Sequence, residues 1–206
     1  MAYQSIWYST DIPDKIVDVI EEELYKTHDD LMDNSCLYNG LVDHDKRNSK
    51  NAWINSDHWV SGFIWHYVNK ANRDNFLYDL NAIDGQHLQY TSYKEGQFYS
   101  WHNDAGLSTY YKPQAIDNHH EASASDFINK NVETVRKLSI VMQLSNHDDY
   151  EGGNLQIMDD GGKSYFAPRK KGTIILFDSR AQHRVLKVTK GVRKSLVGWI
   201  VGPRWR

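Results

Sequence analysis

Residues 172–185 read GTIILFDSRAQHRV, and this stretch carries the clearest sequence evidence for the fold. Ile174 to Phe177 form a short apolar run of β-branched and aromatic residues, which is typical of a strand buried on both faces. A polar turn follows, and His183 stands at the head of the next apolar segment. Such a turn delivers a histidine to the mouth of a β-barrel. The stretch therefore predicts an interior histidine in a β-rich fold.

Segments of the same character fill the second half of the chain. They are short, rich in β-branched and aromatic residues, and separated by Gly, Asn and Asp. The predicted strands are 87–93, 97–102, 135–144, 154–158, 164–166, 173–178, 184–188 and 192–201. Their close turn signals favour a sandwich, a jelly roll or a small barrel.

The first 86 residues carry helical spacing instead. Apolar residues at 16, 17, 20 and 24 predict a helix over about 13–26. Positions 60, 63, 64, 67 and 68 predict a second helix behind the capping candidates at 55–57. We expect one domain over 1–206, with helical support in 1–86 and a β core in 87–206.

A polar stretch at 106–133 interrupts the predicted strands. Long insertions of this kind are more often functional flaps or mobile loops than core elements. Two roles are open for Tyr110 and Tyr111, which lie in this stretch. They either contact a bound substrate as rigid amphipathic side chains or merely decorate the loop.

Composition narrows the class of protein. The 206 residues include seven Trp, thirteen Tyr and six Phe, enough to anchor an autonomous core. Lys and Arg number 24 against 27 Asp and Glu, so no basic field predicts nucleic acid or anionic membrane as a partner. The single Cys36, the absence of a leader-like start and the lack of a run of ~20 apolar residues predict a soluble, cytoplasmic protein.

His102 and Asp104 are the strongest local sign of chemistry. On an extended strand, residues two apart leave the same face, so both side chains could bind one ion. His183 would add a third ligand. Two imidazoles and one carboxylate fill one face of an octahedron and leave three positions open, as in non-haem Fe(II) oxygenases.

Arg193 follows His183 on a neighbouring predicted strand. Facing sheets lie ~10 Å apart, a gap that a five-carbon diacid could span from the metal to a guanidinium. Arg meets a carboxylate with two parallel hydrogen bonds. Ser195 shares the face of Arg193 and could add a hydroxyl contact.

Taken together, these motifs resemble those of the iron(II)- and 2-oxoglutarate-dependent dioxygenases, in the prolyl 4-hydroxylase-like branch. The resemblance covers roughly 88–200. It rests on the order Tyr93, Gly96, Tyr99-x-x-His102-x-Asp104, then Glu151-Gly-Gly-Asn-Leu155, then Pro168, Gly172, Phe177 and His183-Arg-Val185, then Gly191-x-Arg193-x-Ser195 and Trp199. It implies a double-stranded β-helix, a form of jelly roll, with mainly β structure behind N-terminal helices.

The resemblance also implies roles for individual residues. His102, Asp104 and His183 would bind Fe(II), and Arg193 would bind the distal carboxylate of 2-oxoglutarate. Tyr93 and Tyr99 match aromatic positions that line the cosubstrate or substrate pocket. O2 would be the second cosubstrate, and ascorbate a reductant that keeps iron reduced. Halogenating relatives replace the carboxylate ligand with a small residue, so Asp104 argues against halogenation.

The resulting hypothesis is an oxygenase that hydroxylates prolyl residues in a peptide or protein. Two alternatives stay open: a hydroxylase of a free amino acid or other small molecule, and a non-catalytic jelly-roll binding module. A closed pocket would favour the small molecule, and an open groove beside 106–133 would favour the peptide. The sequence names neither the target nor the oligomeric state.

Overall fold

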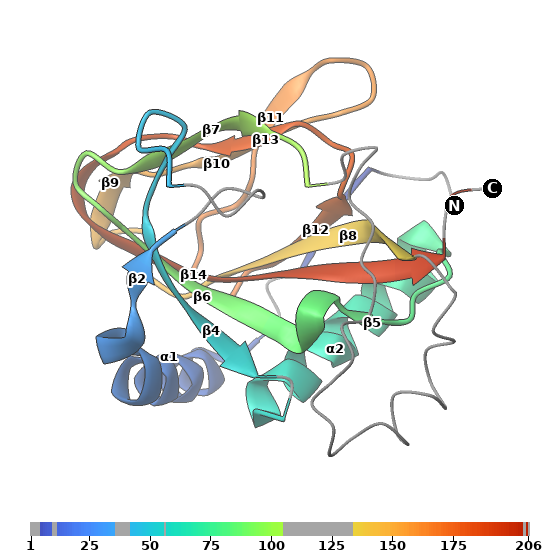
Figure 1. Cartoon of the computed structure of the whole chain (residues 1–206), viewed down its shortest axis with the longest axis horizontal. Coiled ribbons are helices and arrows are strands. Elements are labelled where there is room, and N and C mark those ends of the chain that lie inside the picture. The colour runs from blue at the N-terminus through green and yellow to red at the C-terminus, as the bar shows by residue number, and fades with distance from the viewer. Residues whose placement is uncertain are drawn as a thin grey trace.

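The computed structural model describes residues 5–9, 12–35, 42–55, 57–104, 134–203 and 205. Within them, two antiparallel sheets face each other, and the α-helices cover the outer face of the larger sheet (Figure 1). The strands are β1 (Ile6–Ser9), β2 (Asp33–Asn34), β3 (Arg47–Asn48), β4 (Lys50–Asn55), β5 (Ala82–Ile83), β6 (His87–Lys94), β7 (Phe98–His102), β8 (Thr134–Gln143), β9 (Tyr150–Gly152), β10 (Leu155–Met158), β11 (Ser164–Phe166), β12 (Ile174–Asp178), β13 (His183–Val185) and β14 (Val188–Pro203).

The helices lie in the first half of the chain. They are α1 (Asp14–His28), the 3-10 turn η1 (Asp29–Leu31), α2 (Trp59–Ala71), the π-helix η2 (Asn72–Phe76) and the 3-10 turn η3 (Asp84–Gln86). No helix in the described residues is both long enough and apolar enough to cross a membrane.

The larger sheet runs in the order β1-β12-β8-β14-β6-β4-β2, and β5 and β9 also pair with β14. The smaller sheet runs β11-β10-β13-β7-β3. Each sheet contains strands from both halves of the chain, so the first 86 residues are part of the sheet framework. Two facing antiparallel sheets with this strand exchange confirm the predicted mainly β, jelly-roll class.

Side chains of the larger sheet alternate between two cores. Leu138, Ile140 and Leu196 point to the helices and pack with Val17, Ile64 and other apolar residues of α1 and α2. The opposite face points to the smaller sheet, where Val141 and Phe177 pack with Leu155, Ile157 and Val185. Polar residues on this second face therefore lie in an enclosed space between the two sheets.

Most predicted elements are found with small shifts at their ends, but the predicted strand 184–188 is divided between β13 and the start of β14, and β9 was not predicted. The structure differs in the first 86 residues, where the sequence predicted helices but β1 to β5 also lie. The cap of α2 was also predicted wrongly, because Nδ1 of His58, not residues 55–57, accepts the backbone N–H of Val60 at 3.3 Å.

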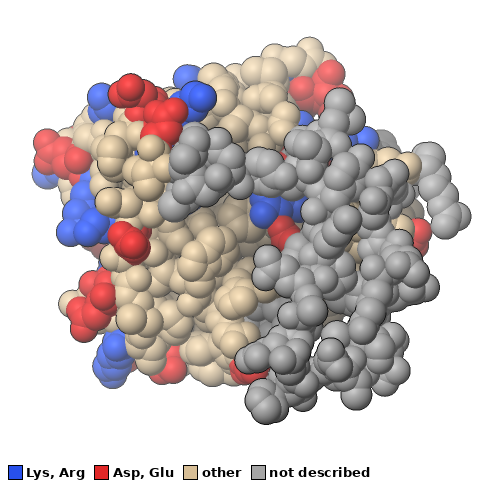
Figure 2. Space-filling model, in the orientation of Figure 1, with Lys and Arg blue, Asp and Glu red and all other residues tan. Residues whose placement is uncertain are grey.

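On the face seen in Figure 2, acidic and basic side chains are intermixed.

Candidate active site

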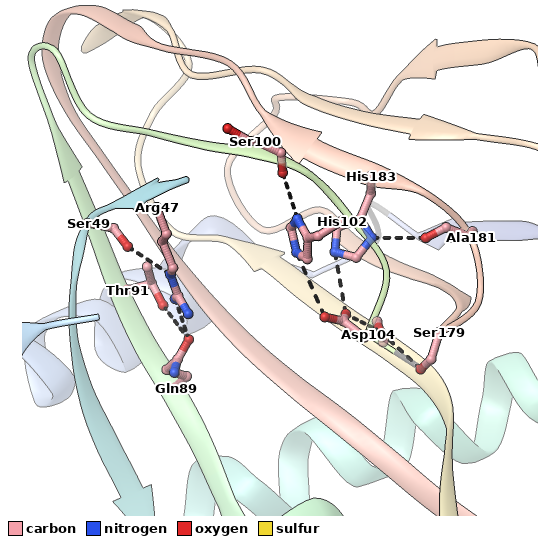
Figure 3. Close-up of polar contacts among 11 residues, drawn as sticks. Arg47, Ser49, Gln89, Thr91, Ser100, His102, Asp104, Ser179, Ala181 and His183 are labelled. Atoms are coloured by element: carbon pink, nitrogen blue, oxygen red, sulfur yellow. Dashed lines mark hydrogen bonds and ion pairs between the residues drawn. The ribbon is translucent and has the colours of Figure 1, made fainter. Parts of the chain in front are cut away.

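Three side chains that are distant in the chain converge between the two sheets (Figure 3). The donor atoms of His102, Asp104 and His183 all lie within 4.8 Å of one another. Nε2 of His102 is 3.8 Å from Oδ1 of Asp104, and Nε2 of His183 is 3.4 Å from Oδ2. The structure thus brings together the three residues that the sequence predicted as one group.

The smaller sheet accounts for this convergence. His183 on β13 lies directly opposite His102 on β7. The pairing then shifts, so that Val185 lies opposite Tyr99 and three steps of β7 face two steps of β13. Such a bulge re-aims side chains, and it puts Tyr99 and His102 on the same face despite their odd spacing. Asp104 follows β7, and its backbone N–H donates to the carbonyl of Ser179 at 2.9 Å.

The second ring nitrogen of each histidine fixes its orientation. Nδ1 of His102 donates to the carbonyl of Ser100 at 2.7 Å, and Nδ1 of His183 donates to the carbonyl of Ala181 at 3.1 Å. A carbonyl can only accept, so the proton of each neutral ring stands on Nδ1. Both Nε2 lone pairs therefore face Asp104, as they must to bind a common metal.

The electrostatics of the site keep its groups ready to bind a cation. Burial lowers the pKa of His102 below its usual range, and the neighbouring His183 acts in the same direction. Burial alone would raise the pKa of Asp104, but His183, His102, Arg136 and the Ser139 hydroxyl outweigh burial and lower that pKa. Ser139 donates to Oδ2 of Asp104 at 2.6 Å. Neutral imidazoles and an ionised carboxylate are the forms that bind metals.

This donor set fits Fe(II). Two imidazole nitrogens and one carboxylate oxygen on one side of a shared point form the two-histidine, one-carboxylate arrangement that leaves positions open for other ligands. A closed structural zinc site would call for a fourth protein ligand. In the described residues, no other group of three or more His, Cys, Asp or Glu side chains meets the geometric requirement for a metal.

Arg193 lies in the same cavity, on β14 of the larger sheet. Its side chain is 1% exposed, and its guanidinium carbon is 5.6 Å from the centre of the Tyr93 ring. Nη2 donates to Oε1 of Gln143 at 2.9 Å, whereas Nη1 is 3.4 Å from the Ser195 hydroxyl. Nε has no partner among the described residues.

The surroundings of Arg193 favour an anionic ligand. No carboxylate of the described residues lies within ion-pair distance of its guanidinium. A buried charge is costly unless it is paired and hydrogen-bonded. A carboxylate that entered the cavity would supply both the missing charge and the missing acceptors.

Comparison with known proteins agrees with this geometry. The sequence model described as the 2OG-Fe(II) oxygenase superfamily matches residues 88–201, more than half of the chain. This chain belongs to the 2OG-Fe(II) oxygenase superfamily. Membership implies Fe(II) as the metal, with 2-oxoglutarate and O2 as cosubstrates.

The chain is similar to curated proteins named PKHD-type hydroxylases. One from Synechococcus sp. (strain CC9311) is 43% identical over 63 residues, which cover 31% of this chain and 28% of the relative. Another from Psychrobacter sp. (strain PRwf-1) is 31% identical over 111 residues, covering 54% of this chain and 36% of the relative. The matched stretches span about a third of these relatives or less.

Solved structures resemble this chain over nearly its whole length. A Pseudomonas putida prolyl-4-hydroxylase superposes with a TM-score of 0.69 at 16% identity, covering 98% of this chain and 94% of that one. A Trichoplax adhaerens prolyl hydroxylase in complex with a hypoxia inducible factor peptide fragment gives 0.68 at 17% identity, with coverage of 96% and 84%. At these identities the likeness establishes the shared fold.

The remaining residues predicted for the oxygenase site lie as follows. Tyr93, Tyr99 and Ser195 line the cavity with Arg193. The ring of Tyr99 stacks on His102, with centroids 3.5 Å apart and planes 18° apart. Burial raises the pKa of Tyr99 to about 12, so its hydroxyl stays protonated. Tyr110, Tyr111 and the whole of 106–133 lie outside the described residues.

The sequence did not predict Arg47, which the oxygenase places on the cavity wall. It is 6% exposed, and its guanidinium lies 4.8 Å from the centre of the Tyr99 ring. Nη2 donates to Oε1 of Gln89 at 2.9 Å, and Nε donates to the Ser49 hydroxyl at 3.1 Å. Figure 3 shows this group beside the His102 site. Arg47 stands in the polar run DHDKRNSKN, where no periodicity distinguishes it from Lys46.

Trp199 is a second cavity residue of the oxygenase whose position in the site was not predicted. Its side chain is 9% exposed, and its indole Nε1 has no partner among the described residues. Here the sequence did carry a signal, since Trp199 is six residues after Arg193 on one strand and must share its face. The cavity thus contains an indole N–H donor that has no partner among the described residues.

Proposed function

We propose that the oxygenase is a hydroxylase that acts on a prolyl residue of a peptide or protein. His102, Asp104 and His183 bind the iron, and Arg193 binds the distal carboxylate of 2-oxoglutarate. The observation that carries this proposal is a single cavity that holds three convergent metal-binding groups and a buried guanidinium whose Nε–H has no partner among the described residues.

When bound, Fe(II) supplies the oxidation by which O2 and 2-oxoglutarate convert a C–H bond to C–OH, with release of succinate and CO2. The protein's own contribution is to position the reactants. Arg193 and Ser195 hold one end of 2-oxoglutarate, and Tyr93 packs beside that carboxylate. The apolar walls at Val141, Leu155 and Phe177 exclude water.

Trp199 recognises the substrate backbone in this proposal. A peptide exposes carbonyl oxygens on both sides of a prolyl residue, and these are acceptors without competing N–H groups at the proline. The indole N–H of Trp199 lacks an acceptor among the described residues and could donate to one of these carbonyls. The likeness in fold to a prolyl hydroxylase bound to a peptide supports a peptide over a free amino acid.

Mass spectrometry of a peptide library tests this function. The library contains matched peptides with and without proline, and free proline is included as a separate substrate. With Fe(II), 2-oxoglutarate and O2, we expect proline-containing peptides to gain one oxygen, located on the prolyl ring, with stoichiometric succinate. A gain confined to free proline would replace the peptide by a small-molecule substrate, and no succinate with any substrate would favour a binding module.

A further inference from the structure

The turn between β12 and β13 contacts two of the three proposed ligands through its backbone. The Ser179 carbonyl accepts the N–H of Asp104 at 2.9 Å, and the Ala181 carbonyl accepts Nδ1–H of His183 at 3.1 Å. The turn also leads directly into His183 itself. Its path therefore sets the position of the Asp104 backbone and the orientation of the His183 ring.

Asp178 holds this turn in shape. Its Oδ1 accepts the backbone N–H of Arg180 and the Nε–H of the same residue, each at 2.9 Å, and its Oδ2 accepts Nη2–H at 2.6 Å. The Asp178 carbonyl in turn accepts the N–H of Ala181 at 2.9 Å. One carboxylate thus fixes both the backbone and the side chain two residues further on.

Tyr78 connects Asp178 to the helical part of the protein. Its hydroxyl donates to Oδ2 of Asp178 at 2.7 Å. The Tyr78 backbone is itself held by the Asn72 side chain, which accepts its N–H at 2.8 Å and donates to its carbonyl at 2.9 Å. The donor to Asp178 is therefore fixed in position.

Asp178 has no contact with the cavity. It is 3% exposed and is not one of the residues that line the site. Its partner Arg180 is 53% exposed, so water screens the ion pair and the pair adds little net stability. The main effect of the Asp178–Arg180 pair is therefore on the shape of the turn that leads to His183.

We propose that Asp178 is a positioning residue for the metal site. It fixes the 178–183 turn so that Asp104 and His183 face the same point as His102. The inference rests on the proposed function, since it takes those three residues as the metal ligands.

The test titrates metal-free protein with Co(II), using calorimetry for affinity and visible absorption for coordination geometry. Loss of an outer hydrogen-bond partner typically weakens a metal site by about 10- to 100-fold, and Asp178 acts one bond further out. We therefore expect Asp178→Asn to weaken Co(II) binding by roughly 10-fold and to alter the absorption spectrum. Tyr78→Phe, which removes a single hydrogen bond, should weaken binding by a smaller factor.

Glu21→Gln is the matched control. Glu21 binds Lys171 at 2.7 Å beside the opposite end of β12, so this variant also loses a carboxylate from an ion pair near that strand. It should bind Co(II) as the wild type does. Equal affinity of Asp178→Asn and wild type, or equal weakening in Glu21→Gln, would overturn the positioning role. If Asp178→Asn does not fold, an unchanged affinity in Tyr78→Phe would overturn it.

The same titration separates this inference from the proposed function. Wild-type protein that binds no Co(II), or that binds it equally well after His183→Ala, would refute the metal site itself. Wild-type binding that is lost in His183→Ala but unchanged in Asp178→Asn would refute only the role of Asp178.

Discussion

Replacing Arg193 with Met tests the anion site, because the change removes the charge and keeps a long side chain. In the structure, Gln143 and Ser195 face two of the guanidinium N–H groups, and the Nε–H has no partner in the described residues. A bound carboxylate would therefore meet free donors in a buried place, where charge-assisted hydrogen bonds are strongest.

The expected loss of 2-oxoglutarate affinity follows from those hydrogen bonds. A hydrogen bond to a charged group contributes about 1.5–3 kcal/mol, and two parallel bonds to one carboxylate would contribute at least about 3 kcal/mol. We expect Arg193→Met to raise the Kd of 2-oxoglutarate by roughly 150-fold, measured by calorimetry with Mn(II) present and O2 absent. Co(II) or Mn(II) affinity in the absence of 2-oxoglutarate should stay unchanged.

Ligand-free stability provides an independent check on Arg193. The variant removes a buried charge that has only neutral partners, so its melting temperature should fall by no more than about 4 °C, or about 1 kcal/mol. Lys190→Met, on the exposed end of the same strand, loses only a surface pair with Glu151 and should leave 2-oxoglutarate affinity unchanged. An Arg193→Met protein that binds 2-oxoglutarate as tightly as the wild type would refute the assignment.

Four further perturbations have defined outcomes. His102→Ala should abolish both metal binding, seen by elemental analysis, and succinate formation, while circular dichroism stays native; retained metal would contradict the ligand assignment. Ser139→Ala removes the 2.6 Å hydrogen bond to the Asp104 carboxylate and should weaken Co(II) binding by about 10-fold, so an unchanged Kd would argue against that bond. Burial alone would raise the pKa of Asp178, but hydrogen bonds from Arg180 and Tyr78 lower that pKa below its ordinary 3.8. The ionised Asp178 therefore stabilises the fold above pH 3.8, and this stabilisation is lost as the pH falls through the pKa of the folded state. In Asp178→Asn, the free energy of unfolding measured with urea should therefore fall less steeply as the pH drops below 3.8. An unaltered dependence on pH would contradict this. Trp199→Phe, which removes the indole N–H, should raise the KM for peptide with little change in the Kd of 2-oxoglutarate, and the reverse pattern would place Trp199 beside the cosubstrate.

Local sequence patterns predicted much of the β core. Alternation and turn residues located β6, β8, β12 and β14 closely, because each is long or apolar enough to show its period. The strands β2, β3 and β5 have two residues each, too few for any period to appear. Their place depends on pairing with β4, β7 and β14, and that pairing comes from tertiary structure.

Some residues of the site could likewise be predicted from the sequence, and others could not. His102, Asp104 and His183 could be predicted together because their spacing and resemblance to a known family pointed to one metal. Arg47 could not, since it reaches the cavity only when β3 pairs with β7. The stacking of Tyr99 on His102 depends on a bulge that no turn residue in the sequence marks. Gly152 shows the opposite case, because its own backbone requires glycine: φ is +70° and a Cβ would lie 2.2 Å from the Lys187 carbonyl oxygen.

A crystal structure grown without O2, in Mn(II) and 2-oxoglutarate, would show directly whether the metal and the cosubstrate bind as proposed. We expect one anomalous-scattering peak, bound by Nε2 of His102, Nε2 of His183 and the carboxylate of Asp104. We also expect 2-oxoglutarate to extend from that metal to the guanidinium of Arg193. A metal bound elsewhere, or a cosubstrate carboxylate with no contact to Arg193, would contradict the proposal.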